Sequence, residues 1–107
     1  MPFDPLPVDL VDDFTRLRVV RDGVAGQTTW CKGELGAPAS ETHCLLGWLL
    51  VSTDWNVPEA TRLAIDYLYP ALPEKQRKCN VMKSLYDYND KHGRDAVVAL
   101  IDRAIAG

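Results

Sequence analysis

The sequence lacks long apolar segments, an excess of basic residues and closely spaced cysteine pairs. Its longest apolar run covers residues 44–51, far fewer than the roughly 20 residues of a membrane span. The formal net charge is −3, whereas nucleic-acid-binding proteins usually carry a basic excess that neutralises phosphates. The cysteines occur singly, with no Cys-x-x-Cys spacing, which predicts reduced thiols that pack as small apolar side chains. These absences disfavour a membrane protein, a nucleic-acid binder and a disulfide-stapled domain.

The common catalytic and cofactor motifs are absent as well. There is no Gly-x-Gly-x-x-Gly, Walker, Gly-x-Ser-x-Gly or His-Glu-x-x-His pattern, so dinucleotide-dependent, ATP-driven and common hydrolase reactions lack their signatures. Zinc sites show tightly paired ligand spacings, but the zinc-binding residue types are scattered here. They are Cys31, His43, Cys44, Cys79 and His92. We predict neither a cofactor nor a metal site.

The N-terminal residues are acidic and rich in proline. A secretory signal has a positive start followed by an apolar stretch, and this segment has neither. We therefore expect the protein in the cytoplasm of its own cell or of a host cell, without a membrane partner.

The length and composition indicate one folded domain. The chain has 107 residues, of which 47% are hydrophobic and 25% charged, as in ordinary globular proteins. The prolines predict an extended arm over residues 1–7, followed by a single helical domain over residues 8–107.

Apolar residues recur at helical spacing in five segments of this domain. The segments follow Asp9, Ser40, Asn56, Pro73 and Gly93. The second contains the apolar run, in which Gly47 predicts a close packing contact. Residues 24–40 are punctuated by glycine, and an irregular loop with one short strand or hairpin is expected there. The predicted fold is an all-α, compact bundle of about five helices around a central buried helix.

Three short motifs occur in a recognisable order. They are Trp30-x-x-Gly33, Cys44-x-x-Gly47 and Asn89-Asp90. In this order, over residues 10–106, they resemble a family of small uncharacterised proteins from bacteria and their phages. The resemblance implies a helical fold and no particular activity. Trp48 stands where a small residue is expected in that family, and the loop after the first motif is shorter, so the local geometry near Cys44 is expected to differ.

Cys44 is the candidate nucleophile of an alternative, enzymatic hypothesis. A helix start favours a thiolate, and His43 or His92 would act as the base. Asn89 or Asp90 would orient that base, which gives a cysteine-dependent hydrolase or transferase. Neighbouring residues of a helix point about 100° apart, so His43 is poorly placed to activate Cys44. A structural, buried cysteine is favoured.

The Asn89-Asp90 pair allows two interpretations. It would either bind a ligand at the start of the last helix or stabilise that junction. Asn and Asp cap helices and tolerate the backbone angles of tight turns, so the structural interpretation is favoured.

Aromatic side chains near loops are the candidate contacts for a partner protein. Trp30 and Trp55 would be either interface anchors or core residues, and the core is favoured. Tyr69 and Tyr88 lie off the apolar helix faces, so they are the better candidates for surface contacts.

A set of basic residues gives a weaker hypothesis of nucleic-acid binding, with affinity that falls steeply with salt. The set comprises Arg62, Lys75, Arg77, Lys78 and Lys83. A solvated helix face is favoured for them. The expected function is therefore that of a small protein-binding module with a host or self protein as partner. The resemblance suggests a phage- or prophage-encoded factor that modulates a host protein such as a defence component.

Overall fold

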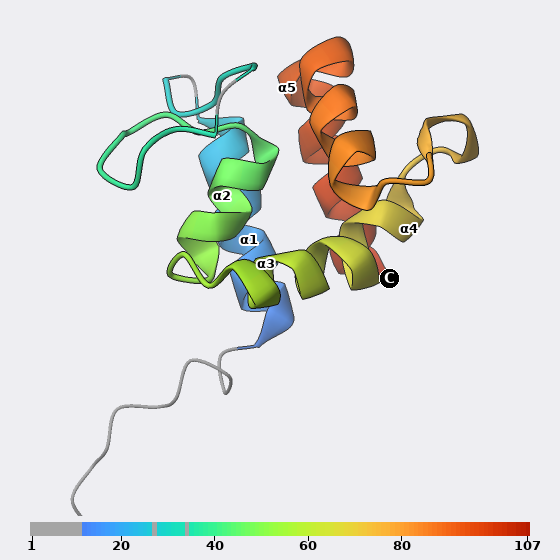
Figure 1. Ribbon diagram of the computed structural model, residues 1–107, viewed down its shortest axis with the longest axis horizontal. Coiled ribbons are helices and arrows are strands. Elements are labelled where there is room, and N and C mark those ends of the chain that lie inside the picture. The colour runs from blue at the N-terminus through green and yellow to red at the C-terminus, as the bar shows by residue number, and fades with distance from the viewer. Residues whose placement is uncertain (1–11, 27, 34) are drawn as a thin grey trace, which may run out of the picture.

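The computed structural model describes residues 12–26, 28–33 and 35–107. Its helical elements, in chain order, are α1 (Asp13–Ala25), α2 (Leu45–Ser52), α3 (Val57–Leu63), the π-helix η2 (Ala64–Leu68), α4 (Tyr69–Ala71), the 3-10 helix η3 (Glu74–Gln76) and α5 (Val81–Ala106). The described residues form no strand, and the expected all-α class is confirmed (Figure 1). The predicted arm over residues 1–7 and the predicted cap at Asp9 lie outside the described residues.

Polar residues cap three of the helices, because the first amides of a helix have no partner within it. The Asp12 carboxylate accepts a hydrogen bond from the Phe14 amide at 2.7 Å at the start of α1. Asn56 caps α3 in the same way, as its position predicts, and Asn80 caps α5.

Two helix starts differ from the prediction. Ser40 does not cap α2; its hydroxyl instead contacts Thr42, and the helix begins at Leu45. The fourth helix does not begin near Pro73, because only the short turn η3 follows that proline. The helix begins instead at Val81, one residue after Asn80.

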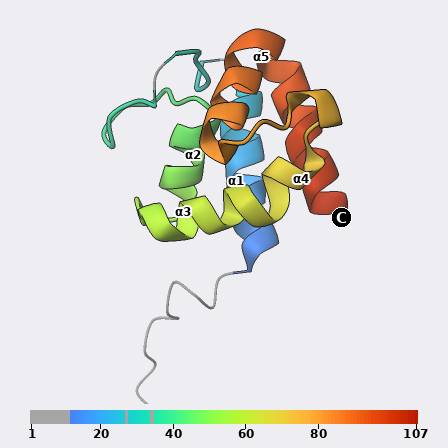
Figure 2. The same ribbon diagram turned by 45° about the vertical axis from the view of Figure 1, so that its right-hand side comes forward.

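α5 unites the two helices that the sequence predicts from near Pro73 and after Gly93. Gly93 interrupts it with φ 85° and ψ 173°, a conformation that residues with a Cβ rarely adopt. The element therefore consists of two helical parts, residues 81–92 and 94–106, and Figure 2 shows it as the longest element of the fold.

The core lies where α1, α2 and α5 pack together, and η2 and α4 close one end of it against α5 (Figures 1 and 2). The largest fully buried apolar side chains are Leu17, Leu45, Leu49, Leu63, Leu68, Leu85, Leu100 and Ile101. Burial of one such side chain stabilises the fold by about 1.5–3 kcal/mol. The apolar run contributes to this core through α2, as predicted. Among the described residues, no helix combines the length and apolar character that crossing a membrane requires.

Candidate functional site

The three sequence motifs meet at the buried side chain of Asn89. Its Oδ1 accepts hydrogen bonds from Trp30 Nε1 at 2.7 Å and from the Leu45 amide at 3.0 Å. Its Nδ2 donates to the Cys31 carbonyl at 3.3 Å. Leu45 is the first residue of α2. The side chain of Asn89, which belongs to α5, therefore caps the start of α2. We call this arrangement the motif junction.

Asp90 and two glycines complete the motif junction. The Asp90 carboxylate accepts a hydrogen bond from the Gly33 amide at 2.9 Å. A Cβ at Gly47 would lie 2.0 Å from the Leu35 carbonyl oxygen, so only glycine allows the loop to lie against α2. The close contact predicted at Gly47 is present, and Asn89 and Asp90 serve structure here.

Cys44 lies beside this junction and is fully buried. Burial raises the pKa of its thiol, and the Gly47 and Leu46 amides oppose that shift. A nucleophilic cysteine needs solvent access and a lowered pKa, and Cys44 has neither. Cys44 is the N-cap of α2 and therefore comes just before the first turn of that helix, which starts at Leu45.

Neither histidine is arranged as a base for Cys44. His43 is buried, and its Nδ1 and Nε2 lie 2.8 Å and 3.0 Å from the carbonyl oxygens of Leu35 and Ser40. His92 is exposed and stacks on Tyr88 with ring centroids 4.5 Å apart. These two contacts of His43 hold the loop that precedes α2 in place. A β-bridge between Trp30 and His43 fixes the same loop from its other side. In the described part of the chain, no group of three or more metal-ligating side chains occurs.

The predicted partner contacts fall into different environments. Tyr88 is 6% exposed, so the prediction that it lies off the apolar helix face is wrong; it is one turn from the fully buried Leu85 and lies on the same face of α5. Trp30 and Trp55 are half-buried. The ring of Trp55 packs edge-on against His43, and the backbone of Trp55 has a positive φ of 62°. Tyr69 is half-buried and donates to the Lys78 carbonyl. None of these side chains is a freely exposed anchor.

The basic set is divided by ion pairs. Arg62 contacts Asp13 at 2.7 Å and also Glu59 and Asp66, and Lys78 lies 3.4 Å from Asp87. The exposed members are Lys75, Arg77, Lys78 and Lys83. Arg62 is thus engaged by carboxylates and is a poor ligand for phosphates, contrary to the weaker hypothesis.

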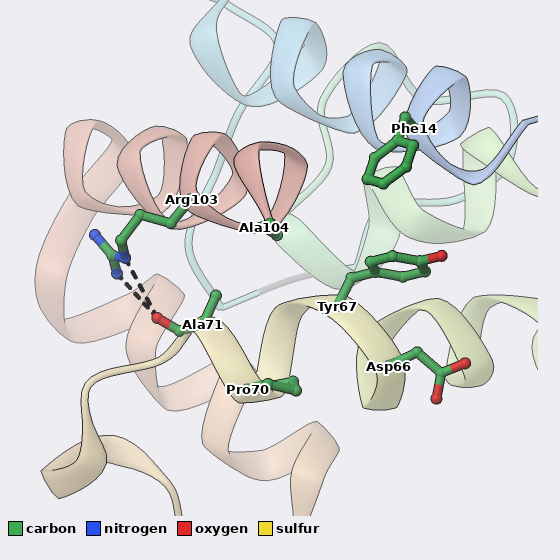
Figure 3. A pocket seen from close by; sticks show the side chains of 8 residues that line it. Phe14, Asp66, Tyr67, Pro70, Ala71, Arg103 and Ala104 are labelled. Carbon is green, nitrogen blue, oxygen red and sulfur yellow. Dashed lines mark hydrogen bonds between the residues drawn. The ribbon is translucent and has the colours of Figure 1, made fainter.

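A pocket of about 540 Å³ opens at the other end of the fold, between α1, the η2–α4 segment and the end of α5 (Figure 3). This volume is typical of binding pockets. It is lined by Phe14, Asp66, Tyr67, Pro70, Ala71, Arg103, Ala104 and Gly107. None of them is among the sequence-predicted site residues. The pocket adjoins the π-helix η2, and π-helical turns are frequent at functional sites.

An ion network fixes the aromatic wall of the pocket. The rings of Phe14 and Tyr67 pack edge to face, 5.6 Å apart, and the Tyr67 hydroxyl donates to Asp13 at 2.7 Å. The Arg62 hydrogen bonds lower the pKa of Asp13 and of Glu59. The Asp13 hydrogen bond in turn raises the pKa of Tyr67, so Tyr67 keeps its proton and its position.

Arg103 forms the basic side of the pocket. Its Nε and Nη2 donate to the Ala71 carbonyl at 3.3 Å and 3.2 Å (Figure 3). Ala71 is the last residue of α4, where unpaired carbonyls attract cations. Arg103 is thereby held at the rim, although its charge meets a neutral acceptor.

Comparison with models of protein families identifies the family of this chain. It matches the model of a family of unknown function, DUF6197, over residues 16–107. The chain therefore belongs to this family. No curated protein and no solved structure gives a match.

Proposed function

We propose that this protein is a protein-binding module and that its docking site is the pocket between α1, the η2–α4 segment and α5. One observation supports this most: an open apolar hollow whose aromatic wall is already fixed by the Asp13–Tyr67–Arg62 network. A preformed hollow reduces the ordering cost of binding. A partner would insert an apolar side chain between Tyr67, Pro70 and Ala104.

The lining favours recognition over chemistry. Its described members are mostly apolar, and its two charged side chains are held by Arg62 and by the Ala71 carbonyl. The cysteine hypothesis places its nucleophile at Cys44, which is buried and belongs to the motif junction. Binding by shape and charge complementarity is the function that such a lining supports.

The resemblance noted in the sequence supports a setting for this module. We place it in the bacterial cytoplasm, or in the host cytoplasm if a phage or prophage encodes it. The partner in that setting is a host or self protein, such as a defence component. This setting rests on the resemblance and on no particular residue of the pocket.

The test compares two alanine-to-tryptophan variants. Ala71→Trp fills the pocket, whereas Ala99→Trp adds the same bulk at an exposed position of α5 outside it. Affinity capture from lysate of the native cell, followed by mass spectrometry, is expected to recover one stoichiometric partner with the wild type and with Ala99→Trp. Ala71→Trp is expected to lose it while keeping its circular dichroism spectrum. Equal recovery by both variants would rule out the pocket as the docking site.

A further inference from the structure

The two charged side chains that line the pocket differ in how they are neutralised. Figure 3 places Asp66 and Arg103 on opposite sides. The Asp66 carboxylate lies 3.5 Å from Arg62. Arg103 has no such partner among the residues that the structure describes, and its guanidinium donates instead to the Ala71 carbonyl. Asp66 shares Arg62 with Asp13 and Glu59, whereas no carboxylate of the described residues forms an ion pair with the guanidinium of Arg103, which is therefore open to a carboxylate from a partner.

The acidic residue nearest to Arg103 in sequence is not available to balance it. Asp102 accepts a hydrogen bond from Arg21 Nε at 2.6 Å, toward α1. A guanidinium has five N–H donors, and the contacts with Ala71 use two of them. The remaining donors suit a carboxylate, and the contact with the carbonyl already restricts the side chain, which lowers the entropy lost on binding.

We propose that the docking segment of the partner carries a carboxylate next to its apolar anchor, and that Arg103 selects it. This inference rests on the proposed docking site and names the chemistry of its occupant. The anchor would lie against Phe14 and Tyr67, whose edge-to-face pair suits an aromatic ring. The protein as a whole is acidic, with a net charge of −3, so an acidic segment is attracted by this local charge and not by the overall field.

Two peptides that differ in charge alone test the inference. The probes are acetyl-Ala-Phe-Asp-Ala-amide and acetyl-Ala-Phe-Asn-Ala-amide, titrated into the full chain and followed by NMR at the amides of Ala71, Ala104 and Gly107. The aspartyl peptide is expected to bind about fivefold to tenfold more tightly at about 50 mM salt, because its hydrogen bond is charge-assisted. The difference is expected to shrink at about 500 mM salt, where exposed charges are screened.

Arginine variants locate the effect. Arg103→Gln is expected to make the two peptides equal, and Arg103→Lys to keep part of the preference. Arg18→Gln, at an exposed arginine of α1, is the matched control and is expected to keep all of it. A preference that survives Arg103→Gln would overturn the role of Arg103.

The outcomes separate this inference from the proposed function. Equal binding of both peptides at the pocket would overturn the carboxylate inference and leave the docking site in place. No change at the pocket amides with either peptide would overturn both. Binding of free phenylacetate as tight as that of the aspartyl peptide would assign the site to a small organic acid instead of a protein segment.

Discussion

The motif junction lies at Asn89, just before the interruption of α5 at Gly93, whereas the pocket lies at the C-terminal end of α5, and the two are built in contrasting ways. At the junction, the Asn89 amide is buried and all of its polar atoms have partners from the loop, from α2 and from Asp90. At the pocket, apolar side chains face a hollow, and Arg103 contacts a neutral carbonyl and forms no ion pair with a described carboxylate. Buried polar groups that are fully paired specify one structure, whereas an open apolar surface with a free charge is suited to a partner.

This contrast separates residues that stabilise the fold from residues that are open to a partner. The motif residues hold the loop and two helices together, and the hydrogen bonds of the Asn89 side chain are all made within the protein. The residues of the pocket belong to no motif. Under the proposed function, a search by motif alone would therefore examine the motif junction and miss the pocket.

The largest effect that tests the contrast is a difference in thiol reactivity. Cys79 is exposed, and Cys44 is fully buried with a raised pKa. Alkylation of Cys44 requires local opening, so iodoacetamide is expected to modify it at least about 10³-fold more slowly than Cys79 near neutral pH, as measured by mass spectrometry. Comparable rates would return Cys44 to consideration as a nucleophile.

Loss of the central amide comes next. Asn89→Ala removes the acceptor of the Trp30 and Leu45 N–H groups. Unpaired buried donors are costly, and the variant is expected to lose about 3 kcal/mol of unfolding free energy in urea denaturation. Ala99→Gly, on the exposed side of α5, serves as a control and is expected to lose about 1 kcal/mol. A loss at position 89 no larger than at position 99 would contradict the junction.

Glycine substitutions give a smaller, graded effect. Gly47→Ala places a Cβ against the Leu35 carbonyl, while at Gly33 the added Cβ meets nothing within 4 Å and only φ 75° is unfavourable. We expect thermal denaturation to show a loss of about 2 kcal/mol for Gly47→Ala and about 1 kcal/mol for Gly33→Ala. The reverse order would show that the loop does not lie on α2.

The network behind the pocket predicts the smallest effect, and it depends on pH. Hydrogen bonds from Arg62 hold the pKa of Asp13 below its usual value near 3.8. A depressed carboxyl pKa stabilises the fold above the unfolded pKa, and this stabilisation is lost as the pH falls through the folded pKa. Asp13→Asn is thus expected to be about 1 kcal/mol less stable at neutral pH and to lose less stability below about pH 4.

Urea denaturation across this pH range checks the prediction, with Asp95→Asn as the control. The side chain of Asp95 is fully exposed, and its ion pair with Arg94 is long, at 3.9 Å. An acid-induced loss of stability that is identical in wild type and Asp13→Asn would show that Asp13 does not stabilise the wall of the pocket.

The helical class was predictable because local signals produce it. Helical spacing of apolar residues, together with Asn56 as a cap, locates α3 and the buried run of α2. The predicted start of α2 was wrong because the side chain that accepts a hydrogen bond from its first amide is that of Asn89, which lies 44 residues away in sequence. The helix start predicted near Pro73 was wrong as well. Proline is acceptable in a first turn, but the residue that caps this helix is Asn80.

The pocket was not predictable from the sequence. Its lining combines Phe14, the segment from Asp66 to Ala71, and the end of α5, which only tertiary packing brings together. The π-helix has no sequence pattern distinct from that of an α-helix. Arg62 was assigned to a basic surface although Glu59 and Asp66 lie within four residues of it, and its third partner, Asp13, lies 49 residues away in sequence.

The interruption at Gly93 has a consequence for how this protein can diversify. One segment of chain before the glycine includes Asn89, and the segment after it includes Arg103. Under the proposed function, substitutions in the second segment would change which partner binds, while the first segment would keep the motif junction intact.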